Sequence, residues 1–120
     1  MTSSINVSKV VQLVHEQLQY YNIGNVEGLC ACYADDVVIK DGDGKVILSG
    51  IEAFRRKYNR VFESHTNIHA DILDEIHCGQ HVVAHESWRR TNAKTGEVFK
   101  GEMLVRFSER GGKITILQFI

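Results

Sequence analysis

The chain has 120 residues, of which 43% are hydrophobic and 24% charged, a composition typical of one compact globular domain. Its 14 Lys and Arg residues nearly balance its 15 Asp and Glu residues, so a net charge of −1 gives no overall attraction to nucleic acid or to a membrane surface. No basic leader precedes an apolar core, and no apolar run approaches the roughly 18–20 residues of a membrane span. We therefore expect a single cytoplasmic domain over 1–120 that binds neither nucleic acid nor membrane. The odd number of cysteines, 3, argues against a disulfide framework.

Two helices are expected at the start of the chain. A stripe of apolar residues at helical spacing ends near segment 22–24 and consists of Val7, Val10, Val11, Val14, Leu18 and Tyr21. Asn25 can then cap a shorter helix that ends at Ala34 and Asp35. The inner face of this second helix would carry Val26, Leu29, Cys30 and Tyr33.

A hairpin and a third helix are expected next. The β-branched runs 37–39 and 46–48 flank a glycine-rich turn, which predicts a short hairpin. Ser49 and Glu52 have the spacing of a capping box and predict the start of a helix. The apolar face of that helix would carry Phe54, Tyr58, Val61 and Phe62.

Four extended segments follow, at about 68–77, 81–92, 97–108 and 113–120. The connections between them are short, which favours antiparallel neighbours. The predicted fold class is α+β, with three N-terminal helices packed on a curved antiparallel sheet. Helices that cover a strongly curved sheet leave an internal pocket at its open end.

The residue patterns exclude the commonest cofactor and metal sites. Histidines recur four apart, at 65 and 69 and at 77, 81 and 85, but four residues along a strand span about 13 Å, which is too far for one ion. Counted from Asp41, a calcium loop would need an oxygen ligand and a glycine where Lys45 and Val46 stand. No phosphate-binding loop, dinucleotide fingerprint or nucleophile elbow occurs. We expect no metal and no cofactor, and acid–base chemistry in the pocket is the remaining candidate, with Asp41 at the end of the first β-run as its carboxylate.

Several segments, in this order, resemble the nuclear transport factor 2-like superfamily of cone-shaped α+β barrels, which includes ketosteroid isomerase and the SnoaL-like cyclases. The segments are Asn22-Ile-Gly-Asn-Val-Glu-Gly28, Tyr33-Ala-Asp-Asp36, Ser49-Gly50, Val105-Arg-Phe107 and Gly112-Lys-Ile114. Two further segments, 68–73 and 82–86, look more like a bacterial subgroup of largely uncharacterised, isomerase-like members. The resemblance covers nearly the whole chain and implies a cone-shaped barrel with an internal pocket.

The resemblance also implies roles for single residues. Asp41 falls where ketosteroid isomerase has its general base. Gln17 and Met103 stand where that enzyme has its two donors to the enolate oxygen, and Met103 cannot donate a hydrogen bond. Loss of preorganised donors costs several kcal/mol in the barrier, so steroid isomerisation itself is not expected.

Further pocket residues follow from the same resemblance. His85 falls on a strand position that faces the pocket, so Asp41 and His85 could divide the base and acid roles. Tyr21 falls near a tyrosine of the scytalone-dehydratase type, and Tyr33 and Tyr58 fall where pocket aromatic residues stand. The alternatives are a hydrogen-bonded core histidine for His85 and a turn carboxylate for Asp41, which would then accept from the backbone of its own hairpin.

The sequence leads to two functional hypotheses. The first is an acid–base enzyme of the isomerase, lyase or cyclase type that binds a small hydrophobic ligand, with Asp41 and His85 as catalytic residues. Its substrate-binding residues would be Gln17, Tyr21, Tyr33, Tyr58 and Met103. The second is a non-catalytic ligand-binding or dimerisation module of the same fold. A homodimer through the sheet face is expected, with Trp88 or Leu104 as exposed apolar contacts.

Overall fold

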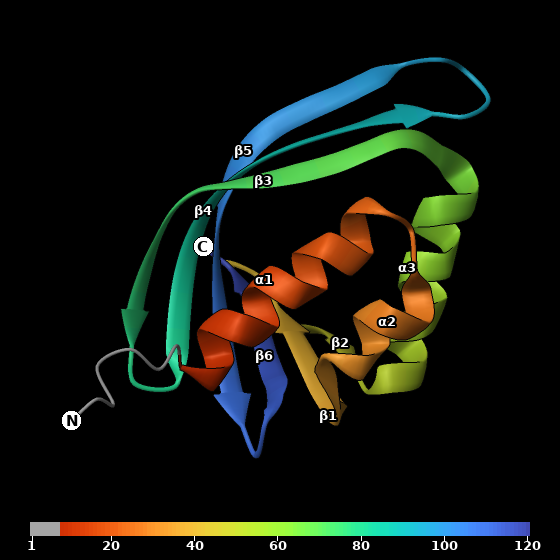
Figure 1. Cartoon of the computed structure of the whole chain (residues 1–120). Helices are drawn as coiled ribbons and strands as arrows, with labels where there is room; N and C mark the ends of the chain where they lie inside the picture. The colour runs from red at the N-terminus through yellow and green to blue at the C-terminus, as the bar shows by residue number, and fades with distance from the viewer. Residues whose placement is uncertain (1–7) are drawn as a thin grey trace.

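The computed structural model describes residues 8–120, which form three helices and six strands (Figure 1). In chain order these are α1 (Lys9–Asn22), α2 (Val26–Ala31), β1 (Tyr33–Lys40), β2 (Val46–Ser49), α3 (Ile51–Ser64), β3 (His65–Cys78), β4 (His81–Asn92), β5 (Val98–Arg110) and β6 (Lys113–Phe119). The predicted order of three helices, a small hairpin and four consecutive strands is confirmed.

The first two helices begin where their capping residues predict. Oγ of Ser8 accepts a hydrogen bond from the backbone of Val11, and Oδ1 of Asn25 accepts one from Gly28. The buried face of α1 contains Val10, Leu13, Val14 and Gln17, whereas Val7 of the predicted stripe lies outside the described residues.

The predicted end of α2 is wrong, because the helix stops at Ala31 and Tyr33 already opens β1. Tyr33 pairs with Ile114 of β6, and the amide of Ile114 donates to the carbonyl of Cys32 at 3.0 Å. These long-range hydrogen bonds replace the ones that a longer helix would have made.

The hairpin of β1 and β2 is confirmed, whereas the predicted cap of α3 is not formed. Gly50, not Ser49, is the residue before the helix, and its φ of 91° lies in the left-handed region that favours glycine. No side chain of residues 8–120 caps this end. Glu52 instead forms an ion pair with Arg55 on the helix surface.

All six strands form one curved sheet in the order β2-β1-β6-β5-β4-β3. The strands from β3 to β6 form the predicted antiparallel series, but β1 pairs with β6 in parallel, so the sheet is mixed rather than antiparallel throughout. The edge strands β2 and β3 do not pair with each other, and the sheet therefore stays open instead of closing into a barrel. Register shifts in β3 accompany its bend over the helices (Figure 1).

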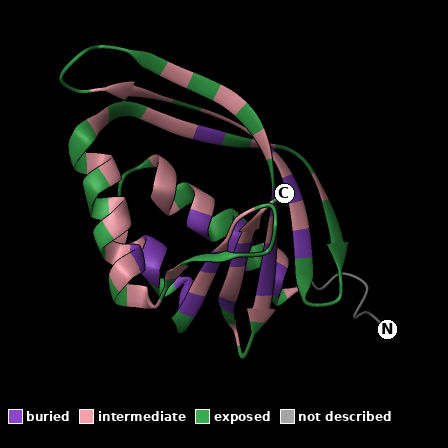
Figure 2. Cartoon of the chain, turned by 180° about the vertical axis from the view of Figure 1, so that it is seen from behind, coloured by how far each residue is buried: buried purple, intermediate pink, exposed green. Residues whose placement is uncertain are grey.

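The hydrophobic core lies between the helices and the concave face of the sheet (Figure 2). Its largest fully buried side chains come from both layers and are Phe54, Leu29, Ile39, Ile114, Val10, Val14, Val37, Val82 and Val105. Burial of such a side chain stabilises the fold by about 1.5–3 kcal/mol. The core holds α1 over β3 to β6 and α3 against β1, β2 and β3, and a cavity remains between these helices and the sheet.

The outer face of the sheet carries isolated apolar side chains. Ile76 and Leu104 are 70% and 43% exposed, whereas Trp88 borders the cavity inside the fold. Dimerisation through the outer face stays a prediction. Within residues 8–120, no helix combines the length and the apolar character needed to span a membrane.

Candidate functional site

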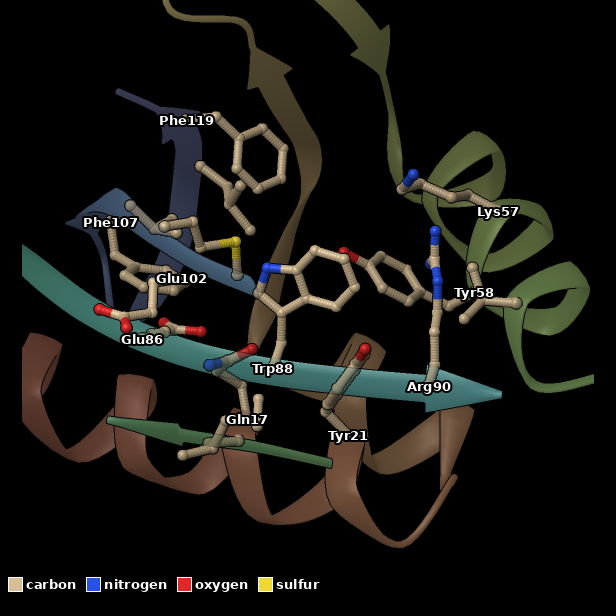
Figure 3. Close-up of a pocket in the computed structure, with 16 residues that line it drawn as sticks. Gln17, Tyr21, Lys57, Tyr58, Glu86, Trp88, Arg90, Glu102, Phe107 and Phe119 are labelled. Atoms are coloured by element: carbon tan, nitrogen blue, oxygen red, sulfur yellow. The ribbon is translucent and has the colours of Figure 1, made fainter. Parts of the chain in front are cut away.

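A cavity with a volume of about 410 Å³ lies between α1, α3 and the inner face of β3 to β6 (Figure 3). Its walls are mostly aromatic and aliphatic side chains, with a few polar groups among them. The residues that line it are Gln17, Leu18, Tyr21, Lys57, Tyr58, Val61, Ala70, Glu86, Trp88, Arg90, Glu102, Met103, Val105, Phe107, Leu117 and Phe119. An apolar cavity with a small number of polar groups is the usual form of a site for a small organic molecule.

Glu86 is the buried acid of the cavity. Along β4, alternate residues are buried at Val82, Ala84 and Glu86, so the carboxyl group of Glu86 points inward between Ile72 of β3 and Met103 of β5. The residue is 3% exposed, and its Oε2 atom is buried without a hydrogen-bond partner among residues 8–120. Burial raises the pKa of this carboxyl group from 4.5 to about 7.

Tyr21 of α1 and Tyr58 of α3 form an aromatic wall of the cavity. Their rings meet edge to face with centroids 6.2 Å apart, and Phe62 packs against Tyr21 at 5.6 Å. Burial raises the pKa of both hydroxyl groups, so both stay protonated and can donate. Neither hydroxyl group makes a hydrogen bond within residues 8–120, which leaves both available to a ligand.

Gln17 borders the cavity but its amide is engaged with the protein. Its Nε2 donates to the carbonyl of Val14 at 3.0 Å, and its Oε1 accepts from the hydroxyl of Tyr33 at 2.9 Å. Tyr33 is 3% exposed and packs against Phe54, with ring centroids 4.4 Å apart. Tyr33 therefore supports the site from the core and does not line the cavity, contrary to the prediction that it contacts the substrate.

Two cations lie at the end of the cavity opposite Glu86 (Figure 3). The guanidinium of Arg90 lies over the Trp88 ring at 5.7 Å, and the ammonium of Lys57 lies 5.7 Å from the centre of the Tyr58 ring. The pKa of Lys57 is lowered by burial and then by the positive charges of Arg90 and Arg60. The Nε atom of Arg90 is buried and has no hydrogen-bond partner in the described part of the chain.

The predicted catalytic pair is not brought together. Asp41 lies in the turn between β1 and β2, where its Oδ1 accepts from the backbone amides of Asp43 and Lys45, each at 3.0 Å. His85 faces away from the cavity, because the neighbouring Glu86 points inward, and its Nε2 lies 2.6 Å from Oε1 of Glu102. Neither Asp41 nor His85 lines the cavity, so the expected pocket containing both residues is not formed.

The other predicted contact residues border the cavity, and their contact with a substrate stays a prediction. Four of them, Gln17, Tyr21, Tyr58 and Met103, line the cavity. Glu86, Trp88, Arg90 and Lys57 are cavity residues that the sequence analysis missed. Glu86, Trp88 and Arg90 alternate along β4 in phase with Ala84, but the consecutive apolar residues 82–84 do not indicate which face of the strand is buried.

Comparison with known proteins identifies the class of this fold. An uncharacterised cystatin-fold protein from Novosphingobium aromaticivorans is similar over 96% of this chain and 99% of its own, with a TM-score of 0.85 and 24% identity. A Δ5-3-ketosteroid isomerase from a Mycobacterium species is similar over 95% and 93%, with a TM-score of 0.82 and 19% identity. A putative polyketide cyclase from Xanthomonas campestris is similar over 92% and 88%, with a TM-score of 0.76 and 20% identity. At these identities the likeness shows the fold alone, which is the nuclear transport factor 2-like fold.

The family model of the SnoaL-like domain matches residues 12–117, and the chain belongs to this family. The predicted superfamily is thereby confirmed. No curated protein matches the chain in sequence.

Proposed function

We propose that the protein binds a small, largely apolar molecule in the cavity and transfers a proton on it, with Glu86 as the group that takes and returns the proton. One observation carries the proposal: the carboxyl group of Glu86 is buried, faces an apolar cavity, and has no partner for Oε2 among the residues that the structure describes. With a pKa of about 7, it is present in both protonation states near neutral pH. Such a group is basic enough to take a proton and acidic enough to return it.

The reaction class that fits these groups is proton transfer next to a carbonyl. The Glu86 carboxylate takes a proton from the carbon beside the carbonyl, and the electrons of that C–H bond move onto the carbonyl oxygen to form an enolate. In a substrate with a carbon–carbon double bond β,γ to the carbonyl, Glu86 then gives the proton to the γ carbon, so the double bond moves into conjugation and the carbonyl is restored. Atoms and electrons balance within one substrate, so the result is an isomerisation.

An enolate oxygen needs hydrogen-bond donors in the same cavity. Tyr21 and Tyr58 supply them in this proposal, because both hydroxyl groups border the cavity, stay protonated and make no bond within residues 8–120. The positions that the family resemblance assigns to such donors are less suitable here. The amide of Gln17 is engaged with Val14 and Tyr33, and Met103 has no donor.

The comparisons support this class of reaction only in general terms. The fold is shared with a protein named as a ketosteroid isomerase and with one named as a putative polyketide cyclase. The donor positions of the family resemblance hold Gln17, whose amide is engaged, and Met103, so steroid isomerisation itself is not proposed. A smaller carbonyl compound also suits a cavity of about 410 Å³.

Hydrogen–deuterium exchange at a carbon acid tests the proposal directly. The probe is 2-tetralone, a compact apolar ketone with exchangeable protons beside its carbonyl, and exchange in D₂O is followed by proton NMR. The wild type is expected to accelerate exchange over buffer, with a rate that rises with pH through about 7 as Glu86 ionises. Glu86→Gln should lose the acceleration, whereas Glu63→Gln, which removes an exposed charge on α3, should keep it.

Two results would count against proton transfer. One is exchange no faster than in buffer although calorimetry detects binding of 2-tetralone, which would leave the cavity as a binding site without catalysis. The other is an unchanged acceleration in Glu86→Gln, which would assign the chemistry to another group.

A further inference from the structure

The cavity has one acidic end and one basic end. Glu86 and Arg90 stand four residues apart on the same face of β4, so their Cα atoms are separated by about 13 Å. Figure 3 shows Trp88 between them, with Lys57 on the side of Arg90. Figure 3 also shows Tyr21 between Glu86 and Arg90, and burial raises the pKa of its hydroxyl group, with a smaller lowering by Arg90 and a smaller raising by Glu86.

The basic end has no anionic partner in the part of the chain that the structure describes. Within residues 8–120, neither Lys57 nor Arg90 forms an ion pair or a hydrogen bond, and their contacts are with aromatic rings. The charged groups that act on Lys57 are two further cations, Arg90 and Arg60. Two cations that share the wall of an apolar cavity repel each other, and buried donors without partners are unfavourable. A ligand with a negative group would relieve both costs.

We propose that the natural ligand is an apolar carboxylic acid whose carboxylate binds between Lys57 and Arg90 while its apolar body lies along Trp88 toward Glu86. The inference rests on the proposed function, because it takes Glu86 as the reacting end. It adds the chemical class of the substrate and its direction in the cavity. Arg90 is suited to the role, since its planar guanidinium can bind both oxygens of a carboxylate.

The proposed binding position also keeps the carboxylate of the ligand away from Glu86 along β4. An anion close to Glu86 would raise the pKa of that carboxyl group further and would oppose its ionisation. About 13 Å of strand keeps the two negative groups apart. Binding at the basic end would therefore hold the ligand without disturbing the group that exchanges the proton.

A set of three matched probes tests the inference. They are 4-cyclohexylbutanoate, its neutral amide and 4-cyclohexylbutylamine, which share one apolar body and absorb little ultraviolet light. Trp88 is the single tryptophan of the chain and borders the cavity, so its fluorescence reports binding at this site. At pH 7 the wild type is expected to bind the carboxylate at least about tenfold more tightly than the amide.

Substitution of the cations should remove this preference selectively. Lys57→Met and Arg90→Met keep most of the apolar stem, so each should lower carboxylate affinity about tenfold. Each should leave amide affinity within about twofold, which also shows that the cavity is still folded. The matched controls are Arg56→Met on α3 and Arg89→Met on β4, both exposed cations outside the cavity, which should change neither affinity.

The possible outcomes separate this inference from the proposed function. Equal affinity for carboxylate and amide, tighter binding of the amine, or no binding of any probe at millimolar concentration would overturn the inference. So would a carboxylate preference that survives in both Lys57→Met and Arg90→Met. Exchange of 2-tetralone involves no carboxylate, so a failure of proton transfer would appear there and leave the carboxylate preference intact.

Discussion

The hydroxyl of Tyr33 donates a hydrogen bond to Oε1 of Gln17 at 2.9 Å, and both side chains are buried. The bond joins β1 to α1 at Gln17, which lines the cavity. Gln17 also donates to the carbonyl of Val14, so its amide is held from both ends. The orientation of a cavity residue is thus set by a core tyrosine that does not itself border the cavity.

Removal of the Tyr33 hydroxyl should destabilise the protein. In Tyr33→Phe, Oε1 of Gln17 loses its partner in a buried place, and an unsatisfied buried acceptor costs about 1–3 kcal/mol in the free energy of unfolding. Urea denaturation measures this loss. Tyr20→Phe is the control, because the Tyr20 hydroxyl makes no hydrogen bond within the described part of the chain, and it should lower stability by less than about 0.5 kcal/mol. Equal losses in the two variants would show that the bond to Gln17 adds nothing to stability.

Glu86 should make the protein less stable as the pH rises. Its pKa is about 7 in the folded state and 4.5 for an unperturbed side chain, so the folded state binds the proton more tightly. Below pH 4.5 both states are protonated and Glu86 imposes no penalty. Between pH 4.5 and 7 the unfolded state ionises first, and above pH 7 the full cost of the buried charge applies. At about 1.4 kcal/mol per pKa unit, stability falls by about 3 kcal/mol over this range.

The comparison with Glu86→Gln isolates this contribution, since other carboxyl groups and histidines titrate in both proteins. The free energy of unfolding of the wild type minus that of Glu86→Gln should fall by about 3 kcal/mol between pH 4 and pH 8.5. The same difference taken with Glu63→Gln, an exposed acid, should stay nearly constant. A difference for Glu86→Gln that does not change with pH would mean that the carboxyl group ionises normally in the folded state.

Asp41 and His85 should affect stability slightly and proton exchange not at all. Asp41→Ala removes two hydrogen bonds to turn amides and should cost about 1 kcal/mol. His85→Ala removes a partly exposed pair with Glu102, which is worth less than about 1 kcal/mol. Both variants should exchange 2-tetralone within about twofold of the wild-type rate, because neither residue borders the cavity. A loss of exchange in either variant would contradict the assignment to Glu86.

Local patterns were sufficient to predict most of the fold. The spacing of Val10, Val14 and Leu18, the cap at Asn25 and the glycine-rich turn after Asp41 all act over a few residues, and the corresponding elements are present. The end of α2 was missed because Tyr33 continues the helical spacing from Leu29 and equally begins a strand. Only its pairing with distant β6 decides between the two.

The inward face of β4 was missed for a related reason. Val82, Val83 and Ala84 are apolar at consecutive positions, so alternation does not tell whether His85 or Glu86 points inward. Pairing with β5 determines which residues of β4 point inward, since Ala84 lies opposite Val105 and both are buried. For Asp41 the alternative of a turn carboxylate is the arrangement observed, with both of its acceptor bonds inside its own hairpin. The parallel pairing of β1 with β6 joins strands that are far apart in the sequence. No local pattern of residues therefore predicts it.

The absence of a side chain at Gly101 is expected to shape the cavity. Gly101 lies opposite Trp88 across β4 and β5, and a Cβ atom at this position would lie 3.3 Å from Cζ2 of the indole. That distance is tighter than an ordinary contact, so in Gly101→Ala the ring of Trp88 must move by a few tenths of an ångström. A displaced side chain costs about 0.5–1 kcal/mol, which corresponds to about two- to fivefold weaker binding of 4-cyclohexylbutanamide.

The fluorescence emission maximum should shift in Gly101→Ala even without ligand. Trp88 is the single tryptophan of the chain, and its ring is itself displaced by the added methyl group. Gly42→Ala is the matched control, since the nearest atom to its added Cβ is the carbonyl oxygen of Phe119 at an ordinary 3.6 Å. It should change neither the emission nor the affinity. Unchanged emission and affinity in Gly101→Ala would show that the indole tolerates the methyl group, and that its position over Gly101 does not determine the shape of the cavity.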